Sequence, residues 1–387
     1  MLEIVKYNCD EYEFPCLLVL GCFDSIHIGH SELLKKAKLQ AKINGLDLGV
    51  MTFTDGKDDG KQVYTFEEKL SVFEEFNVKF VLKIDYDEEF KKTPPLDFLH
   101  NLEEKLNIKA YMSGKDFRFG AGAKGKSSTL KKYAEDDDSG VWYMPVKEVL
   151  LEDEKVGTSV IKRLLAEGNV KKAAEELGRN FFVSGVVQGG HERGTSLGFP
   201  TINIHYPDNK VAVKQGVYSA VCTVDGKDYN AVLSFGGRPT FGEEECVLEV
   251  HLVDFSEDVY GKTVTVQFVD YLREIEKFDC PEELCSRIES DIAITIGSTI
   301  SGAEQPVEEV QPADLVMSEE QPENGNLEQA EQITAEEQPA EQLPGAEEIS
   351  AELACTEQQP AEELPENGDN EQAEQTPVET PAEENND

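Results

Sequence analysis

A hydroxyl and an amide two residues apart, Thr201 and Asn203, could together bind a metal ion. On an extended backbone both side chains point to the same side of the chain. Their oxygens are hard ligands of the kind that a magnesium ion on a nucleotide accepts. The stretch leading to them, from Ser184 onwards, is rich in glycine, which lets backbone amides approach an anion closely. These residues taken alone also fit a plain glycine-rich hairpin with a polar tip, so both interpretations stay open.

A single carboxylate, Glu249, lies in a run that alternates as a strand does, Val247–Val253. The alternation places it on the face opposite Leu248 and Val250. A carboxylate in such a place is ordinarily a solvated side chain. Beside a bound alcohol it could instead accept the hydroxyl proton, which is worth roughly 10²–10⁴-fold in rate.

A second group of candidate residues follows the apolar run Phe14–Leu20, which is typical of a buried parallel strand. The sequence GCFDSIHIGH comes next, and an amphipathic helix is expected from Ser31. A strand, a glycine turn and a helix N-terminus together form an anion site. Two histidines at its mouth, His27 and His30, can donate hydrogen bonds to phosphate. A lone histidine is more often structural, but this spacing in this setting favours a nucleotide site.

The charge of the chain is distributed unevenly. Its net charge is −42, and residues 301–387 contain 26 acidic residues and no Lys or Arg, so the first 300 residues carry −16. This acidity argues against nucleic-acid or anionic-membrane partners. Eight cysteines without a CxxC pair suit a reducing cytosol, and neither a zinc site nor a disulfide framework. The run Cys16–Phe23 is too short to span a bilayer. We expect a soluble, cytoplasmic protein.

The elements that must position these residues divide the chain into two halves. In the first half, strands and helices alternate, which predicts a doubly wound α/β sheet; the strands are Gly49–Thr54, Phe80–Ile84 and Lys109–Ser113, with a helix at Thr65–Phe76. In the second half, a strand from Phe181 breaks at Gly189-Gly190 and resumes over Leu197–Asn203. Helices at Ser159–Glu167 and Val170–Leu177 join the halves, and a last helix runs from Glu282 to about Ile296.

The second half resembles the riboflavin kinase module of the bacterial bifunctional riboflavin kinase/FAD synthetases. The matches begin with LGFPTIN, which ends at Asn203, and continue in order over Phe181 to about Asp291. They are GVY at 216–218, GGRPT at 236–240, LEVHLVDF at 248–255, VYGK at 259–262 and LREIEKF at 272–278. The resemblance implies a small closed β-barrel that transfers the γ-phosphate of ATP to the 5′-hydroxyl of riboflavin.

The resemblance also implies roles for single residues of this half. Thr201 and Asn203 would hold magnesium-ATP, and Glu249 would be the catalytic carboxylate. The phosphates would be covered by the glycine-rich loop, and two further residues would sit over the flavin. The loop residues are Gly189, Gly194 and Thr195, and the flavin-binding residues are Arg273 and Phe278.

The first half resembles the nucleotidyltransferase superfamily, in the GxFDxxHxGH form of the FMN adenylyltransferase half of FAD synthetases. The run GKDFRFG, residues 114–120, is similar to a second segment of that family. The resemblance implies a Rossmann-like domain in which His27 and His30 are catalytic and Asp116 binds flavin. The ATP-binding residues it implies are Gly21, Asp24, Gly29, Thr158, Ser159 and Lys162.

Two segments of this half depart from the family pattern. The family's TFxPHP is TFTDGK here, and its ISSTRIR is VGTSVIK, residues 156–162. Val160 therefore stands where the first family arginine would meet the triphosphate, and Lys162 replaces the second. A lysine keeps the charge but loses the bidentate fork. Lys162, Arg163 or Lys126 could supply part of the missing charge.

These observations predict four parts of the chain. They are a nucleotidyltransferase-like domain at 1–155, a helical linker at 156–180, a riboflavin kinase domain at 181–297 and a tail at 298–387. The tail is acidic, of low complexity and free of aromatic residues, so it is expected to be disordered. Its partner, if any, is not indicated.

Two functions follow from the sequence. In the first, the protein phosphorylates riboflavin to FMN with magnesium-ATP and adenylylates FMN to FAD. In the second, only the kinase works, and the N-terminal domain is a degenerate scaffold that binds a nucleotide or a flavin. Both functions require ATP, riboflavin and Mg²⁺, and neither requires nucleic acid or a membrane.

Overall fold

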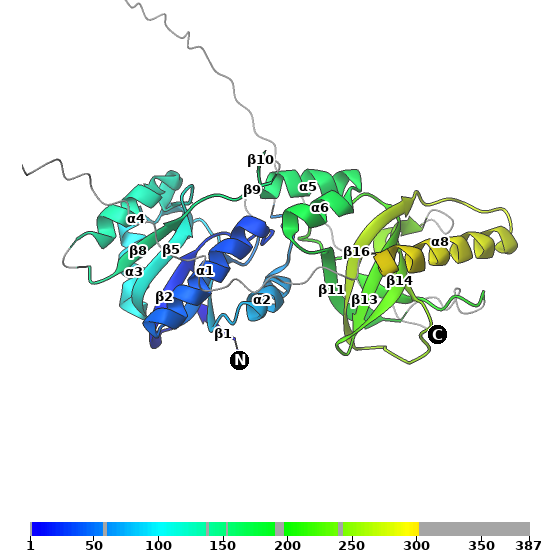
Figure 1. Cartoon of the computed structure of the whole chain (residues 1–387), viewed down its shortest axis with the longest axis horizontal. Helices are drawn as coiled ribbons and strands as arrows, with labels where there is room; N and C mark the ends of the chain where they lie inside the picture. Colours follow the sequence, from blue (N-terminus) through cyan, green and yellow to red (C-terminus); the bar gives the residue numbers. More distant parts are fainter. Residues whose placement is uncertain are drawn as a thin grey trace, which may run out of the picture. The chain divides into compact units, whose positions relative to one another are not determined.

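The computed structural model describes residues 2–56, 60–136, 139–151, 154–189, 197–238 and 243–301. These residues form a parallel sheet with its helices, a pair of linking helices, and a barrel (Figure 1). All of them lie in one unit of the chain, Met1–Glu309. The loop residues Gly194 and Thr195 and the acidic tail beyond residue 301 lie outside the described residues.

The N-terminal part is built on a six-stranded sheet with the strand order β1-β4-β3-β2-β5-β8. Every neighbouring pair in it is parallel. The chain winds outward from β2 in both directions, which is the doubly wound arrangement that the sequence predicted. The strands are β1 (Glu3–Lys6), β2 (Tyr12–Leu20), β3 (Asp47–Phe53), β4 (Phe80–Ile84), β5 (Leu106–Gly114) and β8 (Trp142–Val146).

Hydrophobic side chains cover both faces of this sheet. Along β2, Leu17 and Val19 join one core cluster, and Leu18 and Leu20 join the other. The predicted burial on both sides is therefore confirmed for Cys16–Leu20, whereas Phe14, where the predicted strand begins, is 63% exposed. The covering helices are α1 (Ile28–Asn44), α2 (Phe66–Glu75), α3 (Pro95–Lys105) and α4 (Ser127–Ala134).

Local signals in the sequence explain where these helices begin and end. Gly45, in the left-handed conformation at φ 63°, ends α1. Thr65 and Glu68 form a capping box at the start of α2. Short elements complete this part: η1 (Phe90–Lys92), β6 (Arg118–Phe119), η2 (Ala121–Ala123), β7 (Gly125–Lys126), β9 (Leu150–Leu151) and β10 (Glu154–Lys155).

Two short helices, α5 (Thr158–Glu167) and α6 (Val170–Leu177), link the sheet to the barrel. Gly168 separates them with φ 80°, a conformation that favours glycine. Ile161 and Val170 are buried and belong to the same core cluster as residues of the sheet and the barrel. The linker helices thus carry one hydrophobic core from one part to the other.

The C-terminal part is a closed barrel with the strand order β11-β12-β15-β14-β13-β16, and its neighbouring strands are antiparallel. This confirms the predicted closed barrel. The strands are β11 (Phe181–Gln188), β12 (Ile202–His205), β13 (Gly216–Val224), β14 (Lys227–Arg238), β15 (Glu243–Leu252) and β16 (Thr263–Arg273). The final helix, α8 (Pro281–Ser301), packs against β13 and β14 (Figure 1).

Two predicted boundaries were wrong by five residues each. The strand predicted to resume at Leu197 begins at Ile202, because Gly198 has φ 87° and Pro200 has no N–H for the ladder. The last helix continues past its predicted end at about Ile296 and reaches Ser301. A single glycine such as Gly297 costs a helix only about 1 kcal/mol, so it does not end this one.

Candidate functional sites

The N-terminal candidate residues meet where the strand order of the sheet reverses. Strands β2 and β5 are neighbours, and the chain winds outward in opposite directions from them, so the crevice beyond their carboxyl ends is where such sheets bind ligands. Two pockets open there, the first of about 420 Å³ and the second of about 430 Å³. Both are lined by Cys22, Asp24 and Thr158, so they share a wall.

The turn that follows β2 has an unusual backbone. Phe23 and Ile26 have φ of 50° and 42°, although neither is glycine and both are fully buried. Side chains other than glycine are strained in this region, and such strain is concentrated at functional sites. A Cβ on Gly21 would lie 2.5 Å from the Phe23 ring, so glycine is required there.

The two histidines stack on each other at the start of α1. Their ring centroids are 3.9 Å apart with 13° between the planes. The backbone N–H of His30 donates to Nδ1 of His27 at 3.3 Å, so a neutral His27 carries its proton on Nε2, where it can be donated. Gly29 leaves room for the ring, since a Cβ there would lie 3.1 Å from it.

Both imidazoles are held in the neutral form. Burial lowers the pKa of His27 to about 4 and the pKa of His30 well below its usual value of 6.5. Within the described part of the chain, the buried Nδ1 of His30 has no hydrogen-bond partner. Both histidines line the first pocket, so this pair can offer hydrogen bonds, without a formal charge, to a phosphate.

Asp24, Thr158, Ser159 and Lys162 line the second pocket. Thr158 and Ser159 are the first residues of α5, whose N-terminus favours an anion. The Lys162 ammonium lies 3.2 Å from the Asp24 carboxylate and donates to the carbonyl of Lys61 at 2.7 Å. The structure thus brings a helix N-terminus and a lysine to one wall.

The residue that replaces the first family arginine, Val160, is away from the two pockets. Val160 lines neither pocket and packs against the core. Arg163 is exposed and pairs with Glu167 at 3.6 Å. Lys126 also lines neither pocket. Of the cations considered from the sequence, Lys162 is therefore the one on a pocket wall.

Asp116, the predicted flavin-binding residue of this half, lines the first pocket just beyond β5. Its carboxylate accepts a hydrogen bond from Lys155 at 2.6 Å, and Lys155 also binds Glu148 at 2.8 Å. These bonds raise the pKa of Lys155. Sequence reasoning missed Lys155, because it lies 39 residues from Asp116 and no local pattern connects them.

In the barrel, the predicted kinase residues share one row across neighbouring strands. Asn203 on β12 lies directly opposite Glu249 on β15, and Glu249 lies opposite Ser234 on β14. Directly opposed residues of antiparallel strands project from the same face. Leu248 and Val250 are fully buried in the core, so the row is on the other face, as the alternation predicted. Asn203 is only 8% exposed.

The segment before β12 is fixed onto β15. The Nδ1 atom of His251 lies 2.8 Å from the carbonyl oxygen of Pro200, and the ring of Phe199 packs edge-on against the imidazole. This contact fixes the residue that directly precedes Thr201. His251 was missed by sequence reasoning, although its spacing of two from Glu249 put it on the same face. Gly189 follows the end of β11.

Arg273 and Phe278 lie together beside α8. The guanidinium is 5.8 Å from the centre of the Phe278 ring. It also donates to Oδ2 of Asp291 on α8 at 2.8 and 3.0 Å, and to Oδ1 of the same carboxylate at 3.3 Å. Asp291 is 1% exposed. The two predicted flavin-binding residues are therefore adjacent, and a buried carboxylate that the sequence did not reveal orients one of them.

The donor set around Asn203 suits a magnesium ion that arrives with ATP. Magnesium usually takes one or two protein oxygens and completes its shell with phosphates and water. Thr201 and Asn203 offer a hydroxyl and an amide oxygen, which meets that need. Among the described residues, no group of three or more His, Cys, Asp or Glu could hold a metal without a substrate.

Two family models match this chain, and their ranges include residues of both candidate sites. The family model for FAD synthetase matches residues 9–160, and that for riboflavin kinase matches residues 177–298. The bifunctional riboflavin kinase/FMN adenylyltransferase of Bacillus subtilis is 32% identical over 292 residues, which are 73% of this chain and 92% of that protein. The chain belongs to this bifunctional family. The Escherichia coli K12 member is 30% identical over 285 residues, 71% of this chain and 90% of its own.

A solved structure supports the fold of this family member. A crystal structure from Streptococcus pneumoniae, named as a macrolide-efflux protein, has a TM-score of 0.68 and 28% identity, over 76% of this chain and 98% of that one. That name belongs to the Streptococcus pneumoniae protein, whereas the curated relatives carry the enzyme names. In the part of the chain that the structure describes, no helix is long and apolar enough to cross a membrane.

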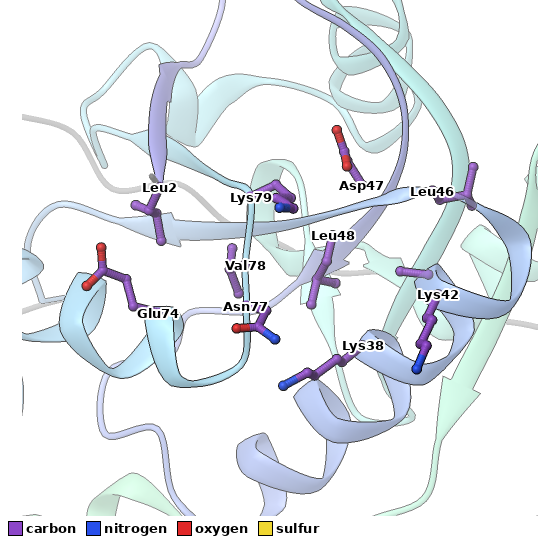
Figure 2. Close-up of a pocket in the computed structure, with 11 residues that line it drawn as sticks. Leu2, Lys38, Lys42, Leu46, Asp47, Leu48, Glu74, Asn77, Val78 and Lys79 are labelled. Carbon is purple, nitrogen blue, oxygen red and sulfur yellow. The ribbon is translucent and has the colours of Figure 1, made fainter.

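A third hollow, of about 510 Å³, lies at the opposite edge of the sheet. Its lining includes Lys38, Lys42, Asp47, Asn77 and Val78, and Figure 2 shows Lys38 of α1 beside Asn77. These residues surround the amino ends of β3 and β4, and none of them was a predicted site residue. Because open α/β sheets bind ligands at the carboxyl ends of their strands, the candidate site of this family member is the pair of pockets by β2 and β5.

Proposed function

We propose that this chain phosphorylates riboflavin to FMN at the barrel and adenylylates FMN to FAD at the sheet. One observation carries the proposal: the residues predicted for each activity lie close together in the fold, one group at the sheet and the other on the barrel. His27, His30 and Asp24 share the crevice beyond β2, and Asn203 lies opposite Glu249 on the barrel. The names of the curated relatives support the same two reactions.

In the kinase step, Glu249 accepts the proton of the ribityl 5′-hydroxyl as its oxygen attacks the γ-phosphorus of ATP. The bond to the bridging oxygen breaks, and ADP leaves with the electron pair. Thr201 and Asn203 would hold Mg²⁺, which neutralises phosphate charge when it is bound with ATP. Arg273 and Phe278 orient the isoalloxazine ring, and Asp291 holds Arg273 in place.

In the adenylyltransfer step, an FMN phosphate oxygen attacks the α-phosphorus of ATP, and pyrophosphate leaves. His27 and His30 donate hydrogen bonds to the phosphate oxygens as charge develops on them. The N-terminus of α5 and Lys162 stabilise the leaving group. Asp116 contacts the flavin from the first pocket.

One observation favours the alternative, a kinase with an N-terminal scaffold: Val160 replaces a family arginine and lines neither pocket. The two functions are separated by incubating the purified protein with riboflavin and magnesium-ATP and resolving the flavins by chromatography. We expect FMN followed by FAD. FMN alone would leave the scaffold function, and no product would contradict both.

Two variants assign the steps to their sites. Glu249→Gln should slow FMN formation by about 10²–10⁴-fold and still convert added FMN to FAD. His30→Ala should instead slow the conversion of FMN to FAD and leave the formation of FMN unchanged. The exposed Glu257 provides a matched control, since Glu257→Gln should leave both steps unchanged. Loss of both steps in either variant would contradict the assignment.

The division of the chain into 1–155, 156–180, 181–297 and 298–387 is also our proposal. It is supported by the ranges of the two family matches, 9–160 and 177–298. We propose a cytoplasmic location, which is supported by six free cysteines among the described residues. Limited proteolysis and fractionation of the cell would test these two points.

A further inference from the structure

The second pocket contains a buried ammonium group that has no part in the mechanism above. It belongs to Lys69 on α2, whose side chain is 1% exposed and lines the pocket wall. Its Nζ atom donates to Oε1 of Gln62 at 2.7 Å and to the carbonyl of Phe53 at 3.2 Å. Among the described residues these are its two hydrogen bonds, so one N–H donor is left for a ligand.

The position of this ammonium is fixed by neighbours that are themselves fixed. The Gln62 side chain is fully buried, and its Nε2 donates to the carbonyl of Thr54 at 3.1 Å. Its backbone N–H donates to the carbonyl of Asn209 at 2.9 Å, and its own carbonyl accepts from Val211 at 2.9 Å. A charge held in this way requires no reorganisation when a ligand arrives, which is the condition for strong electrostatic stabilisation.

Burial makes the ammonium costly without an anion. It lowers the pKa of Lys69 from 10.5 to about 8, and the charges of Asp24, Cys22, Asp55 and Glu67 act in the opposite direction. A lone buried charge is ordinarily paired with an opposite one. Here its two hydrogen-bond partners are neutral. A bound phosphate would supply the missing negative charge.

The surroundings of Lys69 suit a phosphate group. The same pocket is lined by Lys162 and by Thr158 and Ser159 at the N-terminus of α5. Its acidic groups are Asp24, which pairs with Lys162, and Asp55. The first turn of α5 contains no acidic residue. Two ammonium groups and a helix N-terminus therefore meet at one wall.

We infer that Lys69 is a phosphate-binding residue of the adenylyltransferase site, and that it contacts the β- and γ-phosphates of ATP, which leave as pyrophosphate. The inference rests on the proposed function. As the FMN oxygen bonds to the α-phosphorus, the bond from that phosphorus to the bridging oxygen breaks and its electron pair moves to the pyrophosphate. Lys69 stabilises this charge. Lys69 thereby supplies a positive charge that Val160, which packs against the core, does not supply.

The test uses the full chain and two substitutions that separate charge from hydrogen bonding. Lys69→Gln keeps N–H donors for Gln62 and Phe53 but removes the charge, and Lys69→Arg keeps the charge. We expect Lys69→Gln to lower kcat/KM for ATP in FMN-to-FAD conversion by about 10²-fold and to weaken inhibition by added pyrophosphate. Lys69→Arg should retain most of the wild-type kcat/KM for ATP and most of the inhibition by pyrophosphate. Arg163→Met is the matched control, because this cation of α5 is outside both pockets.

The riboflavin kinase step of the same preparations reports on folding. It should remain at the wild-type rate in every variant. The proposal is wrong if Lys69→Gln makes FAD with wild-type kcat/KM, or if pyrophosphate inhibits it as strongly as the wild type. It is also wrong if both variants lose the kinase step and FAD formation together, since that marks a structural role. A wild-type protein that makes no FAD would instead refute the proposed function itself.

Discussion

The carboxylate of Glu68 and the ammonium of Lys210 form an ion pair at 2.5 Å in which both side chains are buried, at 1% and 0% exposed. Glu68 is on α2, and Lys210 follows β12, so the pair joins the sheet part to the barrel part. The ammonium also donates to the carbonyls of Val63 at 2.9 Å and Phe182 at 3.1 Å. The other carboxylate oxygen accepts from the Ser184 N–H at 2.9 Å.

Breaking this pair should destabilise the protein strongly. Lys210→Met removes one partner and leaves a buried carboxylate uncompensated, which typically costs about 3–5 kcal/mol. Chemical denaturation followed by fluorescence would measure it. Lys262→Met is the control, because Lys262 pairs with Asp225 on the surface at 2.7 Å and its loss should matter little.

Replacing both partners should restore much of the loss. Glu68→Leu combined with Lys210→Met leaves no unpaired charge, and buried ion pairs often exchange for apolar residues at little cost. A Lys210→Met protein as stable as Lys262→Met would show that the pair contributes nothing. A double variant less stable than the single one would show that Glu68 has a separate structural role, for which its capping of α2 is the evident reason.

The histidine pair should make the protein sensitive to acid. Both folded rings stay neutral below pH 6.5, because burial lowers the pKa of His27 to about 4 and that of His30 further below its usual value. The unfolded chain binds those protons near pH 6.5, so it is favoured as the pH falls from about 6.5 towards 4. Glutamine at both positions should reduce the loss of stability between pH 7 and pH 5, measured by urea denaturation. An equal loss in both proteins would contradict this.

Local patterns in the sequence predicted those parts of the fold that depend on neighbours along the chain. The strand Phe80–Ile84 and the helix Val170–Leu177 have the predicted bounds, because a short apolar run marks the strand and glycines flank the helix. The start of β12 depends on the local geometry of Gly198, and α8 continues through Gly297 to Ser301. The periodicity of hydrophobic residues predicts neither the start of β12 nor the end of α8.

The residues of the candidate sites divide in the same way, into those that belong to a contiguous motif and those that meet only in the fold. HxGH and LGFPTIN are contiguous, so the sequence revealed them. The pairs Glu68–Lys210 and Lys155–Asp116 join positions 142 and 39 residues apart, and no pattern connects them. Lys69 left one signal: it lies three residues after Phe66 and four before Phe73, on the buried face of α2. A lysine on an apolar stripe indicates a buried charge.

The magnesium assignment predicts that Asn203→Ala abolishes FMN formation, because an oxygen ligand beside the ATP phosphates is lost. The magnesium dependence distinguishes this from a general defect. Excess Mg²⁺ should recover little, and the conversion of added FMN to FAD should continue. Unchanged FMN turnover at saturating magnesium would contradict the assignment of Asn203. His205→Ala is the comparison, since His205 is an exposed residue two positions further along the same strand.

The contact between Asp291 and Arg273 predicts that α8 tunes riboflavin binding. Asp291→Asn removes the charge that holds the guanidinium by three hydrogen bonds, so Arg273 is no longer fixed beside Phe278. We expect the KM for riboflavin to rise about tenfold, which corresponds to about 1.4 kcal/mol, with a smaller change in kcat. Glu289→Gln, an exposed acidic residue of the same helix, should change neither. A variant with a lower melting temperature but an unaltered KM for riboflavin would show that Asp291 only anchors α8 to the barrel.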